Sequence, residues 1–94
     1  MYLEKFLNGE INFLFNKREE LVVFLEHLEK TTSVKWNGDS MPTNYVPTYS
    51  PCVLYCRCYV ERGLRLTHSS HPRGGEIPFE LCYIGYSGDK IFVI

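Results

Sequence analysis

Alanine and glutamine are both absent from the 94 residues of this chain. Helical bundles rely on alanine because it has the highest helix propensity, so its absence favours a fold that contains β-structure. A strong charge imbalance is also missing, since ten Lys and Arg side chains face eleven Asp and Glu, for a formal net charge of −1. Binding to duplex nucleic acid by bulk charge needs a basic surface, so we do not expect that class of partner.

Long apolar runs are lacking as well. No run approaches the roughly 20 residues that a membrane-spanning helix needs, and the first residues lack the apolar segment of a secretory signal peptide. We therefore expect a soluble, cytoplasmic protein without a membrane partner. The hydrophobic share of 45% and the aromatic share of 15% are enough for one core, so the length predicts a single domain over residues 1–94.

The first half of the chain contains the pattern of a strand followed by a helix. Apolar and polar residues alternate over 10–15, which predicts a half-buried strand. Asn16 and Glu19 then match the N-cap and the acid of a capping box. A helix should continue to about Lys30, because apolar residues recur every three or four positions at Leu21, Phe24, Leu25 and Leu28.

The rest of the chain indicates strands and loops. Residues 33–36 read as a short strand that ends at an Asn37-Gly38 turn, and three prolines make 41–51 an extended loop. Further strands are expected at 52–60, 64–68, 81–86 and 91–94. The order predicts an α+β fold: one amphipathic helix packed on a mainly antiparallel sheet of about four to six strands.

Side-chain alternation fixes the expected register of the two hairpins. A three-residue loop at 61–63 pairs Cys58 with Leu66 and Cys56 with His68, which brings apolar side chains onto one face.

The last hairpin turns at Gly88-Asp89. By the same alternation it should pair Tyr86 with Ile91 and Ile84 with Val93.

Four cysteines, three of them within seven positions, allow two interpretations. On the core face of a strand they are small buried apolar side chains, which is the common role of a free thiol. A structural zinc site is the weaker alternative, because the C-x3-C-x-C spacing lies within a strand and lacks the usual C-x2-C turn. The expectation is therefore no metal and no other cofactor at Cys52, Cys56, Cys58 and Cys82.

A catalytic site is not expected either. Cys56 opposite His68 would be the beginning of a thiol nucleophile, but a nucleophile also needs an orienting third group and an oxyanion site. The two aspartates, Asp39 and Asp89, both lie in predicted turns. His68 is more simply a histidine that packs on the sheet, and the chain is predicted not to be an enzyme.

The most distinctive predicted surface is the outward side of the central hairpin. Tyr55, Arg57 and Tyr59 alternate along one strand with Arg65 beside them, although Tyr and Arg are also common on an ordinary solvated sheet face. Tyr and Arg on rigid strands are typical anchors of protein interfaces. With the proline-rich loop added, the predicted partner-binding residues are Tyr45, Tyr49, Tyr55, Arg57, Tyr59 and Arg65.

The same region supports a second hypothesis. Between positions 57 and 73 four Arg and two His stand against a single Glu, so this segment could hold phosphate groups while a tyrosine stacks on a base. The alternative function is thus a sponge that sequesters a small signalling nucleotide at the interface of a homo-oligomer. Its phosphate ligands would be Arg57, Arg65, His71 and Arg73.

Five segments of the chain follow a recognisable order: 16–28, 35–38, 42–43, 64–69 and 91–94. They match a strand, an acid-rich helix, a Lys-Trp-(Asn/Ser)-Gly turn, a Pro-containing loop and hairpins with an apolar tail. In this pattern the chain resembles small proteins encoded by phages and other mobile elements. The resemblance implies a small α+β protein that binds and disables a host protein, such as a component of host defence.

Overall fold

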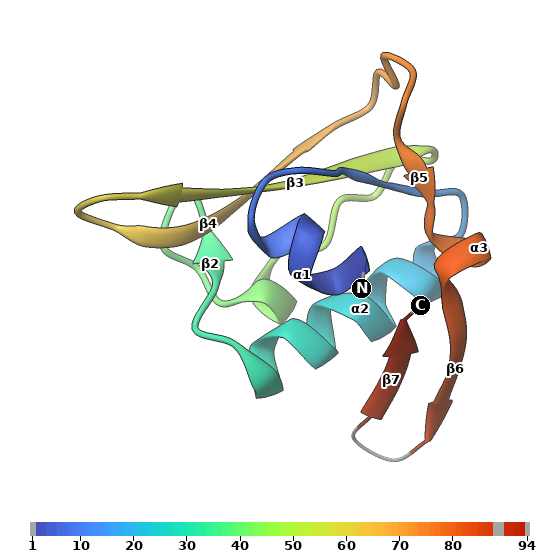
Figure 1. Ribbon diagram of the computed structural model, residues 1–94, viewed down its shortest axis with the longest axis horizontal. Coiled ribbons are helices and arrows are strands. Elements are labelled where there is room, and N and C mark those ends of the chain that lie inside the picture. The colour runs from blue at the N-terminus through green and yellow to red at the C-terminus, as the bar shows by residue number, and fades with distance from the viewer. Residues whose placement is uncertain (1, 88–89, 94) are drawn as a thin grey trace.

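The computed structural model describes residues 2–87 and 90–93, and the side chains of residues 2–82 (Figure 1). Within these residues, three α-helices, one short 3-10 helix and seven strands confirm the predicted α+β class. The predicted Gly88-Asp89 turn lies outside the described residues. In chain order the elements are α1 (Tyr2–Leu7), β1 (Phe13–Phe15), α2 (Arg18–Thr31), β2 (Lys35–Trp36), η1 (Pro42–Asn44), β3 (Cys52–Tyr59), β4 (Gly63–Ser69), β5 (Ile77–Pro78), α3 (Phe79–Cys82), β6 (Tyr83–Ser87) and β7 (Lys90–Val93).

Five strands form the main sheet in the order β2-β4-β3-β1-β5, and β6 and β7 form a separate hairpin. β3 runs antiparallel to β1 and β4, whereas β2 and β5 join the sheet parallel to their neighbours. The sheet is therefore mixed, where a mainly antiparallel one was expected. The long loop after β2 reverses the chain and the β3–β4 hairpin reverses it again, so β2 and β4 run in the same direction.

Helices α1 and α2 lie on one side of the main sheet, and the core fills the space between them (Figure 1). The predicted apolar face of α2 is confirmed, because Leu21, Phe24, Leu25 and Leu28 are each at most 1% exposed. Phenylalanine rings from helices and strands contact one another there, with neighbouring ring centroids 4.7 to 6.3 Å apart. They are Phe6, Phe13, Phe15, Phe24 and Phe79.

The start of α2 differs from the prediction and its end agrees. Asn16 is not the N-cap; Lys17 is, with extended backbone and no side-chain capping bond. Asn16 lies in a bend after β1, and the helix begins one residue later than expected. At the other end, the Thr31 and Thr32 hydroxyl groups donate to backbone carbonyls one turn earlier, at 2.8 and 2.6 Å. The Leu28 carbonyl group also accepts a hydrogen bond from the Thr32 backbone N–H at 2.9 Å, and the helix ends at Thr31, within one residue of Lys30.

The β3–β4 hairpin has a three-residue loop, but it begins one residue earlier than predicted. Leu66 pairs with Cys56 instead of Cys58, and His68 pairs with Leu54 instead of Cys56. The register prediction was therefore wrong by two residues. A shift of two keeps every side chain on its expected face, so the division of the hairpin into a core side and an outer side still holds.

The turn itself explains the shift. Val60 lies in the loop with its side chain fully exposed (105%), and Gly63, the first residue of β4, has a left-handed φ of 77°. That conformation suits glycine because it has no Cβ. The tip of the hairpin thus extends beyond the core, where an apolar pair with Val60 would have gained no burial.

The C-terminal region also departs from the prediction. A short helix, α3, occupies Phe79–Cys82, where the strand was expected to begin at residue 81. Phe79 and Cys82 are both buried, and a spacing of three places them on one side of a helix but on opposite sides of a strand.

In the hairpin that follows, Tyr86 pairs with Ile91 as predicted. Val93 pairs with Tyr83 instead of Ile84, because the register shifts between Tyr83 and Gly85.

Candidate functional site

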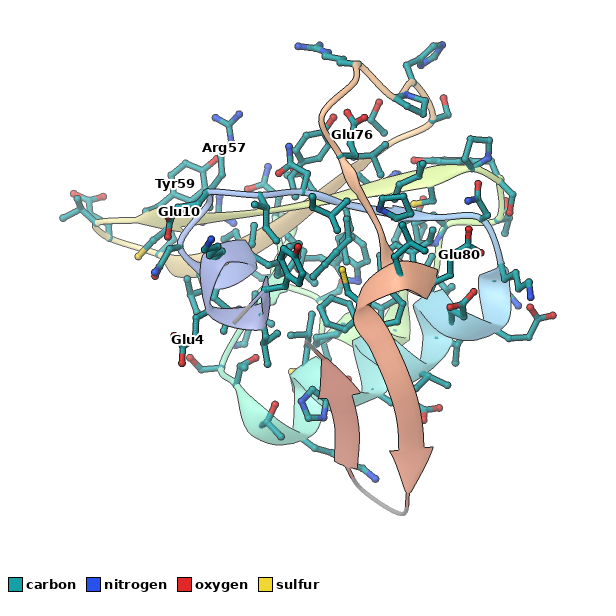
Figure 2. All side chains as sticks on the ribbon, turned by 45° about the vertical axis from the view of Figure 1, so that its right-hand side comes forward. Glu4, Glu10, Arg57, Tyr59, Glu76 and Glu80 are labelled. Carbon is teal, nitrogen blue, oxygen red and sulfur yellow. The ribbon has the colours of Figure 1, made fainter. Side chains whose placement is uncertain are left out.

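The outer face of the molecule is the side of β3 and β4 that points away from α1 and α2. Figure 2 shows Arg57 and Tyr59 on this side. Alternation along β3 places them there, because Cys56, the residue before Arg57, belongs to the core on the opposite side. The outer face therefore presents polar and aromatic side chains on a rigid pair of strands.

A depression of about 250 Å³ lies on the outer face, and we call it the outer depression. A second, more polar hollow of about 420 Å³ adjoins it, shares three of its side chains and continues to Gly9, Asn12 and Glu76. The structure thus brings together residues from two strands and from the 70–76 loop. The outer depression is lined by Tyr55, Arg57, Tyr59, Thr67, Ser69 and Arg73.

Three cationic residues occupy neighbouring positions across the sheet near this depression. Arg57 pairs directly with Arg65, and Arg65 pairs on its other side with Lys35. Side chains of paired residues lie on the same face, so these cations would repel one another without a compensating anion. Asp39 supplies one for Arg65, with Nη2 and Oδ1 3.0 Å apart.

Arg65 is consequently held in place and withdrawn from the surface. Its side chain is only 12% exposed, and its Nη1 also donates to the Leu64 carbonyl group at 2.9 Å. Asp39 binds Arg62 as well (3.2 Å), and the hydrogen bond from Arg62 is the first cause of the lowered pKa of the Asp39 carboxyl. Within the described residues no carboxylate pairs with Arg57, so its charge stays available at the outer face.

Arg73 reaches the outer depression because its loop is fixed by Glu76. The two carboxylate oxygens of Glu76 accept hydrogen bonds from the backbone N–H groups of Arg73 (2.8 Å) and Gly74 (2.9 Å). The bond from Arg73 is the main cause of the lowered pKa of Glu76, which keeps the carboxylate ionised. Gly74 has a left-handed φ of 97°, a conformation in which a residue with a Cβ would be strained.

The four predicted phosphate ligands do not all converge. Arg57 and Arg73 line the same depression, whereas Arg65 is engaged by Asp39. His71 is exposed in the loop, with Nδ1 3.0 Å from the Ser70 hydroxyl oxygen, and lines neither hollow.

Tyr45 and Tyr49 do not join the outer face with which they were grouped. Both rings contact His68, at centroid distances of 5.3 and 5.5 Å, on the core side of β4. Tyr45, but not Tyr49, also lines a pocket at the sheet edge of about 520 Å³, which we call the edge pocket. It is lined mainly by Trp36, Asn37, Ser40, Asn44, Tyr45 and His68.

Sequence reasoning did not anticipate the edge pocket. Trp36 was predicted to be a strand residue and His68 to pack on the sheet, and both residues have these roles. A pocket formed by their rings depends on the parallel pairing of β2 with β4, which the sequence pattern did not reveal.

The cysteines divide into three buried side chains and one exposed side chain. Cys52, Cys56 and Cys82 are part of the core, as expected, whereas Cys58 is exposed because the hairpin tip extends past the core. Burial raises the pKa of Cys52 and of Cys56 to about 11, so these thiols stay protonated at neutral pH. Among the residues that the structure describes, no three His, Cys, Asp or Glu side chains form a group that could hold a metal ion.

No family model matches the chain, and no curated protein or solved structure is significantly similar to it. In the part of the chain that was searched, residues 2–87 and 90–93, no helix has the length and apolar character to cross a membrane. The outer face and the edge pocket are therefore the features from which a function can be inferred.

Proposed function

We propose that this chain is a non-enzymatic binding protein that engages a protein partner through its outer face. The observation that carries the proposal is the outer depression, in which two arginines and two tyrosines meet on the side of the sheet that α1 and α2 do not cover. Tyr and Arg are the residue types most enriched among energetically dominant interface residues. Strands hold them in fixed positions, which lowers the entropic cost of binding.

The charges of this face favour an acidic partner surface. Arg57 has no ion-pair partner within the described residues, and Arg73 adds a second guanidinium at the same depression. Guanidinium groups bind carboxylates with paired hydrogen bonds, so Asp or Glu side chains of the partner are the expected counterparts. The resemblance to small phage proteins suggests a host protein, such as a defence component, as the target of inhibition.

Binding is favoured over catalysis by the chemistry of the thiols and of His68. Cys56 no longer lies opposite His68, since Leu54 takes that position. The raised pKa of Cys56, about 11, leaves it without thiolate at neutral pH, and the thiolate is the reactive form. A stoichiometric inhibitor needs no nucleophile.

The test is affinity capture of a partner followed by titration calorimetry with that partner. The double variant Arg57→Ala/Tyr59→Ala should weaken binding by about 100-fold or more, as expected when two interface anchors are removed. Both side chains are exposed, so circular dichroism should show an unchanged fold. Raising the salt concentration should weaken the wild-type complex, because the arginines contribute through charge.

Arg18→Ala provides the matched control. Arg18 is also an exposed arginine, but it lies at the start of α2, away from the outer face. Its variant should bind as the wild type does. If Arg57→Ala/Tyr59→Ala bound the captured partner with wild-type affinity, the proposal would be refuted.

The nucleotide sponge is the second candidate, and one observation favours it. Arg57 and Arg73 line one depression with Tyr55 and Tyr59, so two guanidinium groups and an aromatic ring are available to one phosphorylated ligand. Native mass spectrometry of the purified protein would detect a retained nucleotide and the number of subunits. A ligand-free species that shows no thermal shift with cyclic nucleotides would eliminate this candidate.

A further inference from the structure

The edge pocket forms where β2 ends and β4 continues. β2 pairs with β4 only at Lys35 and Trp36, and the last bond between them joins the Asn37 N–H to the Leu66 carbonyl group at 3.0 Å. The chain then turns away, because Asp39 adopts a left-handed φ of 73°. β4 beyond Leu66 therefore has no β2 partner, and Thr67 and His68 line the opening that remains.

Aromatic rings form the walls of the edge pocket, and the Trp36 ring stands nearly perpendicular to the other two. The plane of Trp36 makes an angle of 82° with that of Tyr45 and 89° with that of His68, at centroid distances of 5.5 Å. The Tyr45 and His68 rings are tilted by 37°. The walls thus form a corner in which a flat ring can stack on one aromatic face and meet the edge of another.

Two hydrogen bonds hold the walls in place before any ligand arrives. Trp36 Nε1 donates to the Pro42 carbonyl group at 2.9 Å, and the Tyr49 hydroxyl group shares a hydrogen bond with His68 Nδ1. These bonds fix the indole and imidazole rings, and they leave Nε2 as the imidazole atom that can meet a ligand. A preformed site binds more tightly, because less side-chain freedom is lost.

The lining of the edge pocket carries no formal charge. No Asp, Glu, Lys or Arg is among the nine residues that line it. Burial lowers the pKa of His68, so its imidazole is neutral at pH 7. Asp39 is close in sequence, but its carboxylate is engaged by Arg62 and Arg65. An ionic ligand would lose hydration here without gaining a counter-charge.

One side of the pocket is nevertheless rich in hydrogen-bonding groups. Asn37, Ser40 and Asn44 all line it. The Asn37 Oδ1 atom accepts a hydrogen bond from Arg62 Nη1 at 2.9 Å, so its amide NH2 group is left to donate. An aromatic side chain of a peptide has no use for such groups around its ring, whereas a nucleobase presents donors and acceptors along its edge.

We infer that the edge pocket binds the base of an uncharged nucleoside, stacked on the aromatic walls and hydrogen-bonded to the asparagine side of the pocket. The volume of about 520 Å³ falls within the range of small-molecule sites. Thr67 borders both this pocket and the outer depression, but the aromatic rings and asparagines that would hold the base do not line the depression. Occupation of the pocket therefore does not depend on the proposed protein partner.

Trp36 makes the inference directly testable, because it is the only tryptophan in the chain. Its fluorescence should be quenched in a saturable way by at least one of adenosine, guanosine, cytidine and uridine, and ribose alone should have no effect. Calorimetry with the same nucleoside supplies a measurement that does not depend on Trp36. Tyr45→Ala should weaken binding about tenfold, a typical loss for one stacking ring, and Asn44→Ala should also weaken it.

The controls separate this inference from its alternatives. Tyr45 is 47% exposed, so its truncation should not disturb the fold, and Tyr59→Ala on the outer face should bind the nucleoside as the wild type does. Three results would overturn the inference. They are the absence of saturable quenching with all four nucleosides, much tighter binding of a nucleoside 5′-monophosphate, and a stronger response to N-acetyl-tyrosinamide than to any nucleoside.

Discussion

The outer face and the edge pocket are built from the same strand, yet their chemistry is opposite. Arg65 and Thr67 of β4 point to the outer face, while Leu66 and His68 point to the core side. The outer face is cationic, and the edge pocket is neutral and aromatic. The comparison shows how side-chain alternation lets one strand serve a charged macromolecular surface and a small neutral site.

Leu66→Ala should weaken the outer face and the edge pocket together. Leu66 is fully buried between β2 and β3, so its truncation leaves a cavity beneath the strand that both surfaces share. A buried leucine replaced by alanine typically costs about 2–5 kcal/mol of stability, measured by urea unfolding. Tyr59→Ala is the control and should change the unfolding free energy little. A loss below about 1 kcal/mol for Leu66→Ala would mean that this part of the core is loosely packed.

The contrast between the outer face and the edge pocket also explains which features the sequence could predict. The apolar stripe of α2 and the two faces of β3 follow from local periodicity, and both are confirmed for the residues that the core buries. Tyr55, Arg57 and Tyr59 could therefore be placed together on the outer face. Arg73 could be suggested only from charge, because its position depends on the Glu76 carboxylate that fixes its loop.

The remaining features depend on contacts between distant segments. The parallel pairing of Trp36 with Leu66 joins a strand to one thirty residues later, and no periodicity encodes it. Tyr45 was assigned to the outer face because the sequence of an extended, proline-rich loop gives no sign of which side it will cover. The register error at Leu66 has a related cause, since alternation fixes the face of a residue but not its partner.

Acidification should affect the edge pocket, because protonation of His68 adds charge to this neutral site. The unfolded His68 titrates near its ordinary pKa of 6.5, and burial lowers that pKa in the folded protein. Between these two pKa values the unfolded chain binds more protons than the folded protein does. The free energy of unfolding therefore falls as the pH is lowered through this window, and it is retained above the window. Thermal unfolding should show a smaller decrease between about pH 7.5 and 5.5 for His68→Asn than for the wild type.

Nucleoside binding should weaken over the same pH range, because the protonated imidazole brings a charge into a pocket that has no anion to balance it. Trp36 fluorescence titrations at each pH measure this effect, with His68→Asn as the control. If nucleoside affinity depended equally on pH in the two proteins, His68 would be excluded as the group whose protonation weakens binding.

Chemical modification of Cys58 is expected to change binding least, and it tests where the outer face and the edge pocket end. Cys58 is exposed, but alternation places it on the opposite side of β3 from Arg57 and Tyr59. A thiol reagent such as iodoacetamide should modify Cys58 first, since Cys52 and Cys56 are buried and have pKa values raised to about 11. Peptide mass mapping identifies the modified residue.

The modified protein should bind both the partner and the nucleoside within about twofold of the unmodified protein, as is usual for changes away from an interface. Cys58 lies beyond the core and outside both hollows, so an added acetamide group meets neither surface. A large loss of partner binding would show that the interface wraps around the hairpin tip to its inner side. A large loss of nucleoside binding would instead show that the tip and the edge pocket are coupled, because Arg62 in the hairpin loop holds Asn37 and Asp39 beside that pocket.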